Sequence, residues 1–138
     1  MSSSGISNIS GQQLGPNTRR KTAKSIWFNL DNGSGTTIDD VILAAVEALT
    51  ITDARIVYVD ATSGTVAAGN VKVGTTVGGA EIVAATAYAN SATVGTTTAM
   101  TLVNAKVPAG TMISVRHTGV AATAAGQAFV QIEYMFDK

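Results

Sequence analysis

Residues 127–136, "QAFVQIEYMF", decide the class of fold, because apolar side chains occupy every second position. In a β-strand, successive side chains point to opposite faces of the sheet. One face of this stretch would carry Val130, Ile132, Tyr134 and Phe136. The opposite face would carry Phe129, Gln131, Glu133 and Met135. The pattern predicts an amphipathic strand at the end of the chain.

Strand patterns of this kind recur upstream at short intervals. In "TITDARIVYVD" (50–60), one face would hold Ile51, Asp53, Arg55, Val57 and Val59, and the other Thr52, Ala54, Ile56 and Tyr58. Further along, Val71 and Val73 flank Lys72, and the segments between strands are rich in Gly, Thr, Asn and Ser. Such spacing is typical of β-sandwiches. We predict an all-β fold, a jelly-roll-like antiparallel β-sandwich of about seven or eight strands.

Residues 36–49, "TTIDDVILAAVEAL", allow two interpretations. Ile38, Ile42 and Leu49 fall at helical spacing, and Thr37 with Asp40 resembles a capping box in which Asp replaces Glu. The run "VILAAV" is equally consistent with a buried strand, and the β character of every neighbouring segment favours an extended conformation. Helix and strand both stay open for residues 37–49.

The composition points to a protein that lies against neighbours. Of 138 residues, 46% are hydrophobic and only 13% are charged, whereas an average soluble domain carries about 25% charged residues. No apolar run approaches the roughly 20 residues needed to span a bilayer, and the N-terminus does not resemble a secretory signal. Because exposed apolar surface usually marks interaction sites, we expect part of this surface to be covered by other subunits.

The N-terminal segment differs from the rest of the chain. We predict an extended basic N-terminal arm over residues 1–24 and a β-sandwich domain over 25–138. All charges in the arm are positive, and the remainder is mildly acidic. The arm is either a disordered terminus or a segment that orders on a neighbouring subunit. We expect docking on an acidic protein surface rather than on nucleic acid. The predicted partner-binding residues are Arg19, Arg20, Lys21, Lys24 and Trp27.

Motifs for catalysis or for binding metals and cofactors are weak in this sequence. The glycine-rich stretch "TVAAGNVKVGTTVGG" (65–79) lacks the phosphate-loop pattern, so its glycines are expected to supply turns. Cysteine is absent, and a single histidine, His117, is expected at the surface or in an interface. Asp39 and Asp40 would point to opposite faces of a strand, and "DNGSGTTIDD" (31–40) only faintly resembles a calcium loop. We therefore expect no catalytic residue, metal or cofactor, and no enzymatic activity.

Three segments together resemble a known family. They are "LTITDARIVYVDATSGTVAAGNVKVG" (49–74), "VPAGTMISVRHTG" (107–119) and "FVQIEYMF" (129–136). Over residues 25–138 the chain resembles the capsid decoration, or cement, proteins of tailed bacteriophages. The resemblance implies a non-enzymatic virion protein, assembled in the host cytoplasm. It would form a homotrimer on the outer capsid surface and clamp neighbouring major capsid protein subunits, with no membrane contact. It carries over no individual functional residue.

Two other functions remain open from the sequence. The chain could be a different phage component, such as a head fibre, tail or baseplate protein. It could also be a carbohydrate-binding β-sandwich that uses aromatic rings as stacking platforms. The candidate platforms are Trp27, Tyr58 and Tyr88.

Overall fold

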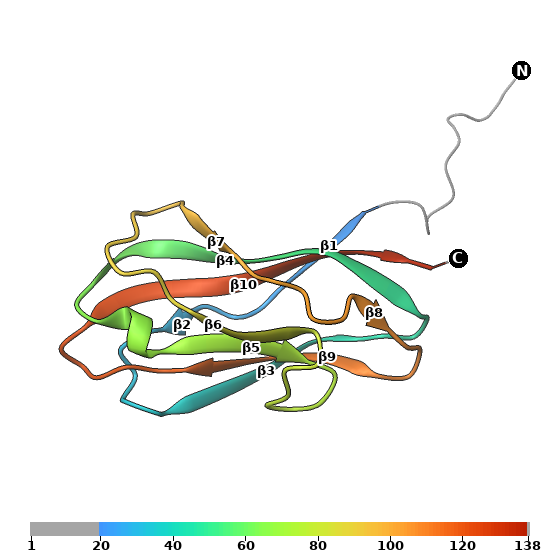
Figure 1. The fold of residues 1–138 in the computed structure, drawn as a ribbon, viewed down its shortest axis with the longest axis horizontal. Coiled ribbons are helices and arrows are strands. Elements are labelled where there is room, and N and C mark those ends of the chain that lie inside the picture. Colours follow the sequence, from blue (N-terminus) through green and yellow to red (C-terminus); the bar gives the residue numbers. More distant parts are fainter. Residues whose placement is uncertain (1–19, 138) are drawn as a thin grey trace, which may run out of the picture.

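Two long antiparallel strands, β4 (Leu49–Ser63) and β10 (Ala125–Phe136), form the centre of one sheet. The computed structural model describes residues 20–137 of the chain (Figure 1). The predicted alternation of β10 is confirmed: Val130, Ile132 and Tyr134 are buried, whereas Gln131 and Glu133 are only half-buried. This pair carries much of the core because its inward side chains are large and apolar.

Two antiparallel sheets enclose the core. The first has the order β1-β10-β4-β7, with β2 also paired to β10 and β8 to β4. Its shorter strands are β1 (Lys21–Lys24), β2 (Phe28–Asn29), β7 (Thr97–Ala99) and β8 (Lys106–Val107). The second has the order β3-β9-β5-β6. Its strands are β3 (Thr37–Ala44), β5 (Asn70–Gly74), β6 (Val83–Ala87) and β9 (Met112–Thr118).

The strand order is that of a jelly roll. If β1–β2 and β7–β8 each count as one interrupted strand, the first strand pairs with the last and the second with the last but one. The remaining pairs, β4 with β7–β8 and β5 with β6, continue this nesting. Figure 1 shows the resulting layers, with β4 and β10 above and β3, β5 and β9 below. The predicted antiparallel sandwich is confirmed.

Residues 37–44 form a strand, so the extended interpretation of this segment is confirmed and the helical one is wrong. β3 pairs with β9 from Thr37 to Ala44, with a register shift between Val41 and Leu43. The extra residue, Ile42, is half-buried like its neighbour Leu43, and both pack against the core. A bulge in a strand explains why the apolar spacing there imitated a helix.

A second bulge corrects the predicted faces of residues 50–60. Ile51 was expected beside Asp53 and Arg55, yet it is buried together with Ala54. The pairing steps from Asp53↔Glu133 to Ile51↔Tyr134, so Thr52 is an extra residue in β4. Because strand side chains alternate with a period of two, one inserted residue reverses the faces beyond it.

The glycine-rich stretch supplies turns, as predicted. After the short 3-10 turn η2 (Val66–Ala68), β5 leads into a loop that folds back on itself. The Glu81 carboxylate closes the loop by accepting hydrogen bonds from the Thr75 backbone N–H, at 2.9 Å, and the Thr76 hydroxyl, at 3.0 Å. Gly78 has a positive φ of 75°, and a Cβ there would meet the Arg116 guanidinium at 2.5 Å. A side chain at this position would therefore be strained and would have to displace the Arg116 guanidinium.

Truncating the core should show how strongly β10 supports the fold. Ile132 is fully buried and pairs with Ala54 and Ala23 on the two flanking strands. Ile132→Ala should lower the free energy of unfolding by about 2–5 kcal/mol, measured by urea denaturation, because it leaves a cavity. Val46→Ala is the control. Val46 is 85% exposed, and this substitution should lower the free energy of unfolding by no more than about 0.5 kcal/mol. Equal losses for the two variants would contradict this packing.

Candidate partner-binding surface

The connection between β1 and β2, which both pair with β10 in the first sheet, is held by hydrogen bonds to both sheets. Ser25 donates its N–H to the Val130 carbonyl, and the Ser25 hydroxyl accepts the Val130 N–H, both at 2.9 Å. The next residue, Ile26, donates its N–H to the Asp40 carboxylate on β3 at 2.8 Å. Residues 25–26 therefore tie β10 of one sheet to β3 of the other.

This connection holds Trp27 in solvent on a fixed backbone. Phe28, which follows it, is buried, and its ring stacks on the His117 imidazole at a centroid distance of 5.1 Å. Trp27 thus lies between two anchored segments, yet 62% of its surface is exposed. A large aromatic side chain on a rigid support loses little conformational entropy on binding, which is the usual property of an interface hot spot.

Two edge strands lie beside this connection. β1 is an edge strand of the first sheet and β3 an edge strand of the second, and the hydrogen bond from Ile26 to Asp40 links residues 25–26 to β3. Ile26 is 53% exposed, and Trp27 follows it directly. We call Ile26 and Trp27 the apolar ridge. Exposed apolar residues beside unpaired strand edges mark a surface suited to a protein partner.

Ile26, Phe28 and Leu30 alternate in the sequence, but only Phe28 and Leu30 are buried. The strand is interrupted here, because β1 ends at Lys24 and β2 begins at Phe28. A period of two therefore does not extend through residues 25–27, and the sequence carries no local signal for that interruption.

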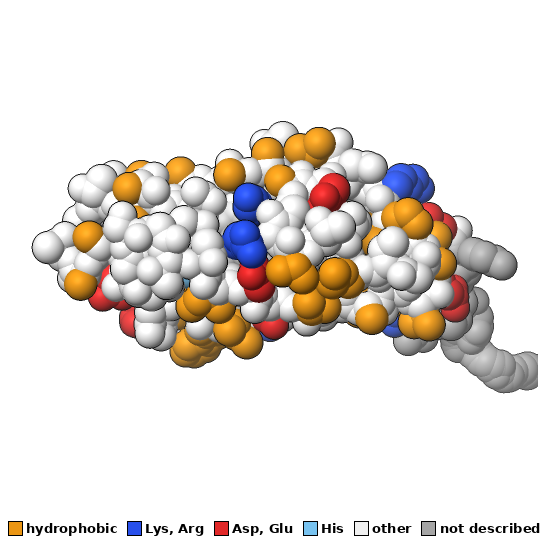
Figure 2. Space-filling view, turned by 90° about the horizontal axis from the view of Figure 1, so that it is seen from below, with side chains coloured by type: hydrophobic (Ala, Val, Ile, Leu, Met, Phe, Trp, Pro, Cys, Tyr) orange, Lys and Arg blue, Asp and Glu red, His pale blue; other side chains and the backbone are white. Residues whose placement is uncertain are grey.

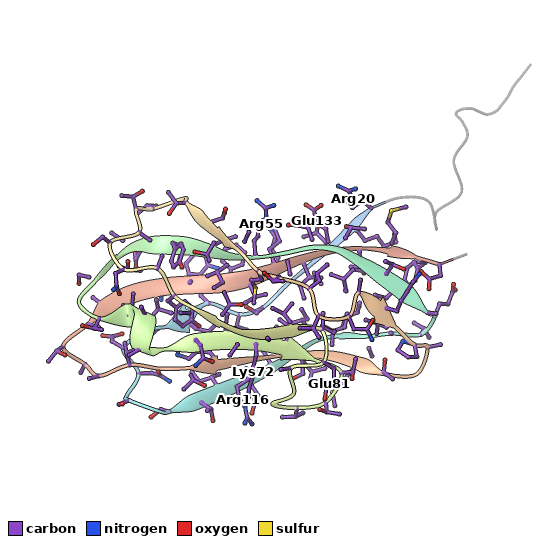
Figure 3. The ribbon with its side chains drawn as sticks, viewed as in Figure 1. Arg20, Arg55, Lys72, Glu81, Arg116 and Glu133 are labelled. Atoms are coloured by element: carbon purple, nitrogen blue, oxygen red, sulfur yellow. The ribbon has the colours of Figure 1, made fainter. Side chains whose placement is uncertain are left out.

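The predicted basic residues do not form one cluster. Arg19 lies outside the described residues. Arg20 reaches the Glu133 carboxylate at 3.4 Å, so part of its charge is offset on the outer face of the first sheet (Figure 3). Lys21 and Lys24 occupy β1 at positions three apart, which places them on opposite faces of that strand. The Lys24 ammonium lies 5.9 Å from the centre of the Phe129 ring.

The outer face of the second sheet carries a short charged row. Lys72, Arg116 and Asp39 are in register across β5, β9 and β3. Asp39 accepts two hydrogen bonds from Arg116, at 2.7 and 2.8 Å, and these hold the pKa of its carboxyl below the ordinary value. Figure 2 shows this face, where basic and acidic side chains form a narrow band and hydrophobic ones gather on either side. The outer face of the second sheet therefore carries few charges that an apolar partner would have to desolvate.

His117 is buried, so its expected place at the surface is wrong. The Tyr88 hydroxyl lies 2.6 Å from Nδ1, and the Asn32 side-chain oxygen lies 2.9 Å from Nε2. Because that oxygen can only accept, Nε2 carries the ring proton and Nδ1 accepts from Tyr88. A Cβ on Gly119 would collide with the Asn32 oxygen, so only glycine fits beside this network. Burial lowers the pKa of His117 to about 4.

The other candidates from the sequence were aromatic stacking platforms and acidic residues. Tyr58 and Tyr88 are buried, so neither ring can serve as a stacking platform. Asp39 and Asp40 do point to opposite faces, one toward Arg116 and the other toward Ile26. Within residues 20–137 no group of three or more His, Asp or Glu side chains is placed to hold a metal ion. No helix in the same part of the chain is long and apolar enough to cross a membrane.

Comparison with known proteins reveals likeness at the level of structure. No protein-family model matches the chain, and no curated protein matches its sequence. A chain of the cyanophage Pam1 capsid asymmetric unit superposes with a TM-score of 0.62 at 15% identity, over 95% of this chain and 94% of that one. At this identity the likeness shows that the two chains share a fold, and the coverage shows that they have about the same length.

Weaker likeness extends to infectious bursal disease virus. Its Gx strain superposes with a TM-score of 0.40 at 15% identity, over 93% of this chain and 37% of that one. A mutant of the VP2 protein of that virus, in T=1 particles, has a TM-score of 0.42 at 17% identity, over 93% and 36%. This chain spans little more than a third of either of them.

The buried histidine should make stability depend on pH. The pKa of His117 is lower in the folded state than its ordinary value of 6.5, so the unfolded chain binds the extra proton first. The free energy of unfolding should keep its full value above about pH 6.5 and decrease as the pH falls toward 4. Between about pH 7 and 4.5 the loss attributable to His117 should be about 2 kcal/mol.

Urea denaturation at those two pH values tests this with His117→Asn. The variant removes the titrating ring while other groups titrate as before, so its stability should decrease about 2 kcal/mol less than that of the wild type over this range. The same decrease in both proteins would show that His117 is not the group responsible.

Proposed function

We propose that this chain is a structural protein of a phage virion that docks on the outer surface of the head across neighbouring major capsid protein subunits. The observation that carries the proposal is the apolar ridge, where Trp27 is held rigidly in solvent beside strand edges that have no partner strand within residues 20–137. In water such a surface favours association, because burying it removes apolar area from solvent.

The fold supports the same proposal. A chain from the asymmetric unit of a phage capsid shares this architecture over nearly its whole length, and the sequence segments quoted above resemble phage decoration proteins. Fold alone does not determine function, so the proposal also depends on the low charge of the chain and on its exposed apolar residues. A subunit that is repeated around a capsid needs only modest contacts, since many weak contacts in one lattice add avidity.

The basic residues and a homotrimer complete the proposal. Residues 1–19 precede β1, and Arg19, Arg20, Lys21 and Lys24 would favour an acidic surface of the coat protein. Three copies of the chain would associate through closed symmetry and engage adjacent coat subunits together. Glu133 already offsets Arg20, so we assign most of the salt dependence to Arg19, Lys21 and Lys24.

Removing the indole should weaken binding to the head. Trp27→Ala should reduce the affinity for heads prepared without this protein by at least about tenfold, because hot-spot aromatics contribute about 2 kcal/mol or more. Co-sedimentation with purified heads measures this affinity. Val94→Ala is the matched control, since Val94 is 65% exposed and lies outside the ridge, and its affinity should stay within about twofold. Wild-type binding by Trp27→Ala would contradict the role of the ridge.

Two truncations separate the arm from the sandwich. A chain lacking residues 1–19 should keep its full stability but bind heads more weakly and with less dependence on salt. A chain lacking residues 1–24 should also lose stability, because it removes β1 and leaves that side of β10 unpaired between Gln131 and Tyr134. Thermal denaturation and co-sedimentation distinguish these effects. Equal stability of the two truncations would show that β1 contributes nothing.

A further inference from the structure

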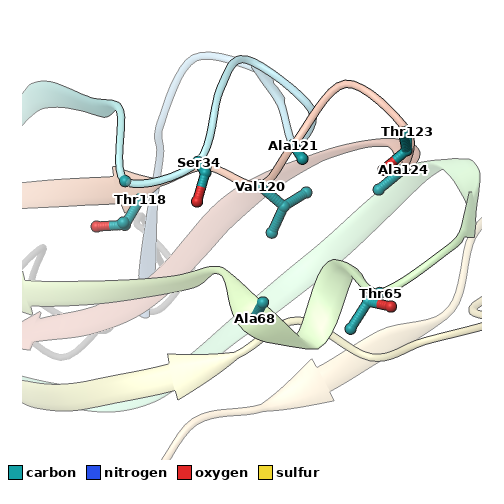
Figure 4. Close-up of a pocket in the computed structure, with 10 residues that line it drawn as sticks. Ser34, Thr65, Ala68, Thr118, Val120, Ala121, Thr123 and Ala124 are labelled. Atoms are coloured by element: carbon teal, nitrogen blue, oxygen red, sulfur yellow. The ribbon is translucent and has the colours of Figure 1, made fainter.

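We propose that a pocket at one end of the sandwich is a second docking site, which accepts an uncharged side chain of the protein partner. The inference rests on the proposed function for the identity of that partner. The pocket has a volume of about 360 Å³ and lies among the turn at η2, the loop before β3 and the loop between β9 and β10 (Figure 4). This volume is in the range of ligand pockets in proteins, roughly 300–1,000 Å³.

The pocket lies far from the end where the N-terminal segment enters. Two of its lining residues, Thr65 and Ala124, adjoin the pairing of Ser63 with Ala125, where β10 begins. Lys21 pairs with Tyr134 near the other end of β10. At about 3.4 Å per residue, the intervening part of β10 separates the two places by roughly 30 Å. A partner that reaches both would therefore contact the sandwich at two separate places.

Backbone hydrogen bonds hold the upper wall of the pocket in place. Gly35 donates its N–H to the Gly119 carbonyl at 3.1 Å, and Gly119 donates to Thr36 at 2.8 Å. Val120 donates to Leu30 at 2.8 Å and accepts from Gly33 at 3.0 Å. Because these bonds link the two loops in both directions, the pocket is formed before any partner arrives. A preformed site requires little ordering on binding.

The lining is neutral and rich in uncommitted hydroxyl groups. Ser34, Thr65, Thr118 and Thr123 line the pocket, and none of their hydroxyls makes a hydrogen bond within residues 20–137. Hydroxyl groups elsewhere in the protein often form hydrogen bonds. The hydroxyls of Thr62 and Tyr58, for example, form hydrogen bonds of 2.7–2.8 Å with the backbone of loop residues. In Figure 4, Ser34 and Val120 point toward the turn that carries Ala68. The pocket thus offers hydroxyl groups beside alanine and valine surface, with no charged side chain.

This chemistry favours a neutral protein side chain over other ligands. An anion or a cation would lack a countercharge, because no Lys, Arg, His, Asp or Glu side chain lines the pocket. A sugar ring would find no aromatic face to stack on. A side chain such as Asn, Gln, Ser or Thr can use both the hydroxyls and the apolar wall, and burying it would satisfy groups that are otherwise solvated.

Filling the pocket tests the proposal against a neighbouring control. Ala121 lines the pocket and Ala122 does not, although both are exposed in the same loop. Ala121→Phe should reduce the affinity for purified heads lacking this protein by about tenfold, while Ala122→Phe should stay within about twofold of the wild type. Equal binding by both variants would overturn the pocket proposal. Failure of the wild type to bind would instead overturn the proposed function, and the pocket proposal with it.

A second pair of variants keeps the test valid if phenylalanine disturbs the loop. Thr118→Val removes a lining hydroxyl at nearly constant volume, and Thr37→Val makes the same change at its register partner on β3, outside the lining. Only Thr118→Val should weaken head binding, by a few fold. Titration of the labelled protein with neutral saccharides should leave the Gly35 and Gly119 amide resonances unchanged. Saturable shifts there would overturn the choice of a protein partner.

Discussion

The pairing of β10 with strands on both of its sides is the constraint on which the rest of the structure depends. It joins the beginning of the chain to its end, since β1 and β2 lie along one side of β10 and β4 along the other. The strands between them pair in the same way, β3 with β9, β4 with β7 and β8, and β5 with β6, and this is the jelly-roll order. The contacts are far apart in sequence, so the entropy of closing large loops must be offset by burial of the core between the sheets.

The same pairing creates the surface that we assign to a partner. Residues 25–27 interrupt the pairing along β10 between β1 and β2, and Ile26 bonds there to Asp40 on β3. Phe28 continues into the core, where it stacks on His117, and Trp27 is left in solvent. The exposed indole thus accompanies the interruption of the edge strand. A rigid aromatic side chain at that place is suited to burial against a partner.

Local sequence patterns predicted the parts of this structure that depend on local geometry. The alternation in β10 and around Lys72 identified strands, because burial of one face requires a period of two. Bulges at Thr52 and Ile42 broke that period, and the faces near Ile51 were therefore mispredicted. His117 was missed for a different reason: its cage consists of Phe28, Asn32 and Tyr88, which only the tertiary fold brings together. The pocket is invisible in the sequence because small residues from three separate segments line it.

An electron cryomicroscopy map of phage heads incubated with this chain tests the central claim most directly. The account predicts jelly-roll density on the outside of the head, with Trp27 buried against a coat subunit or a second copy of the chain. A particle without this density, or a bound chain whose Trp27 faces solvent, would contradict it.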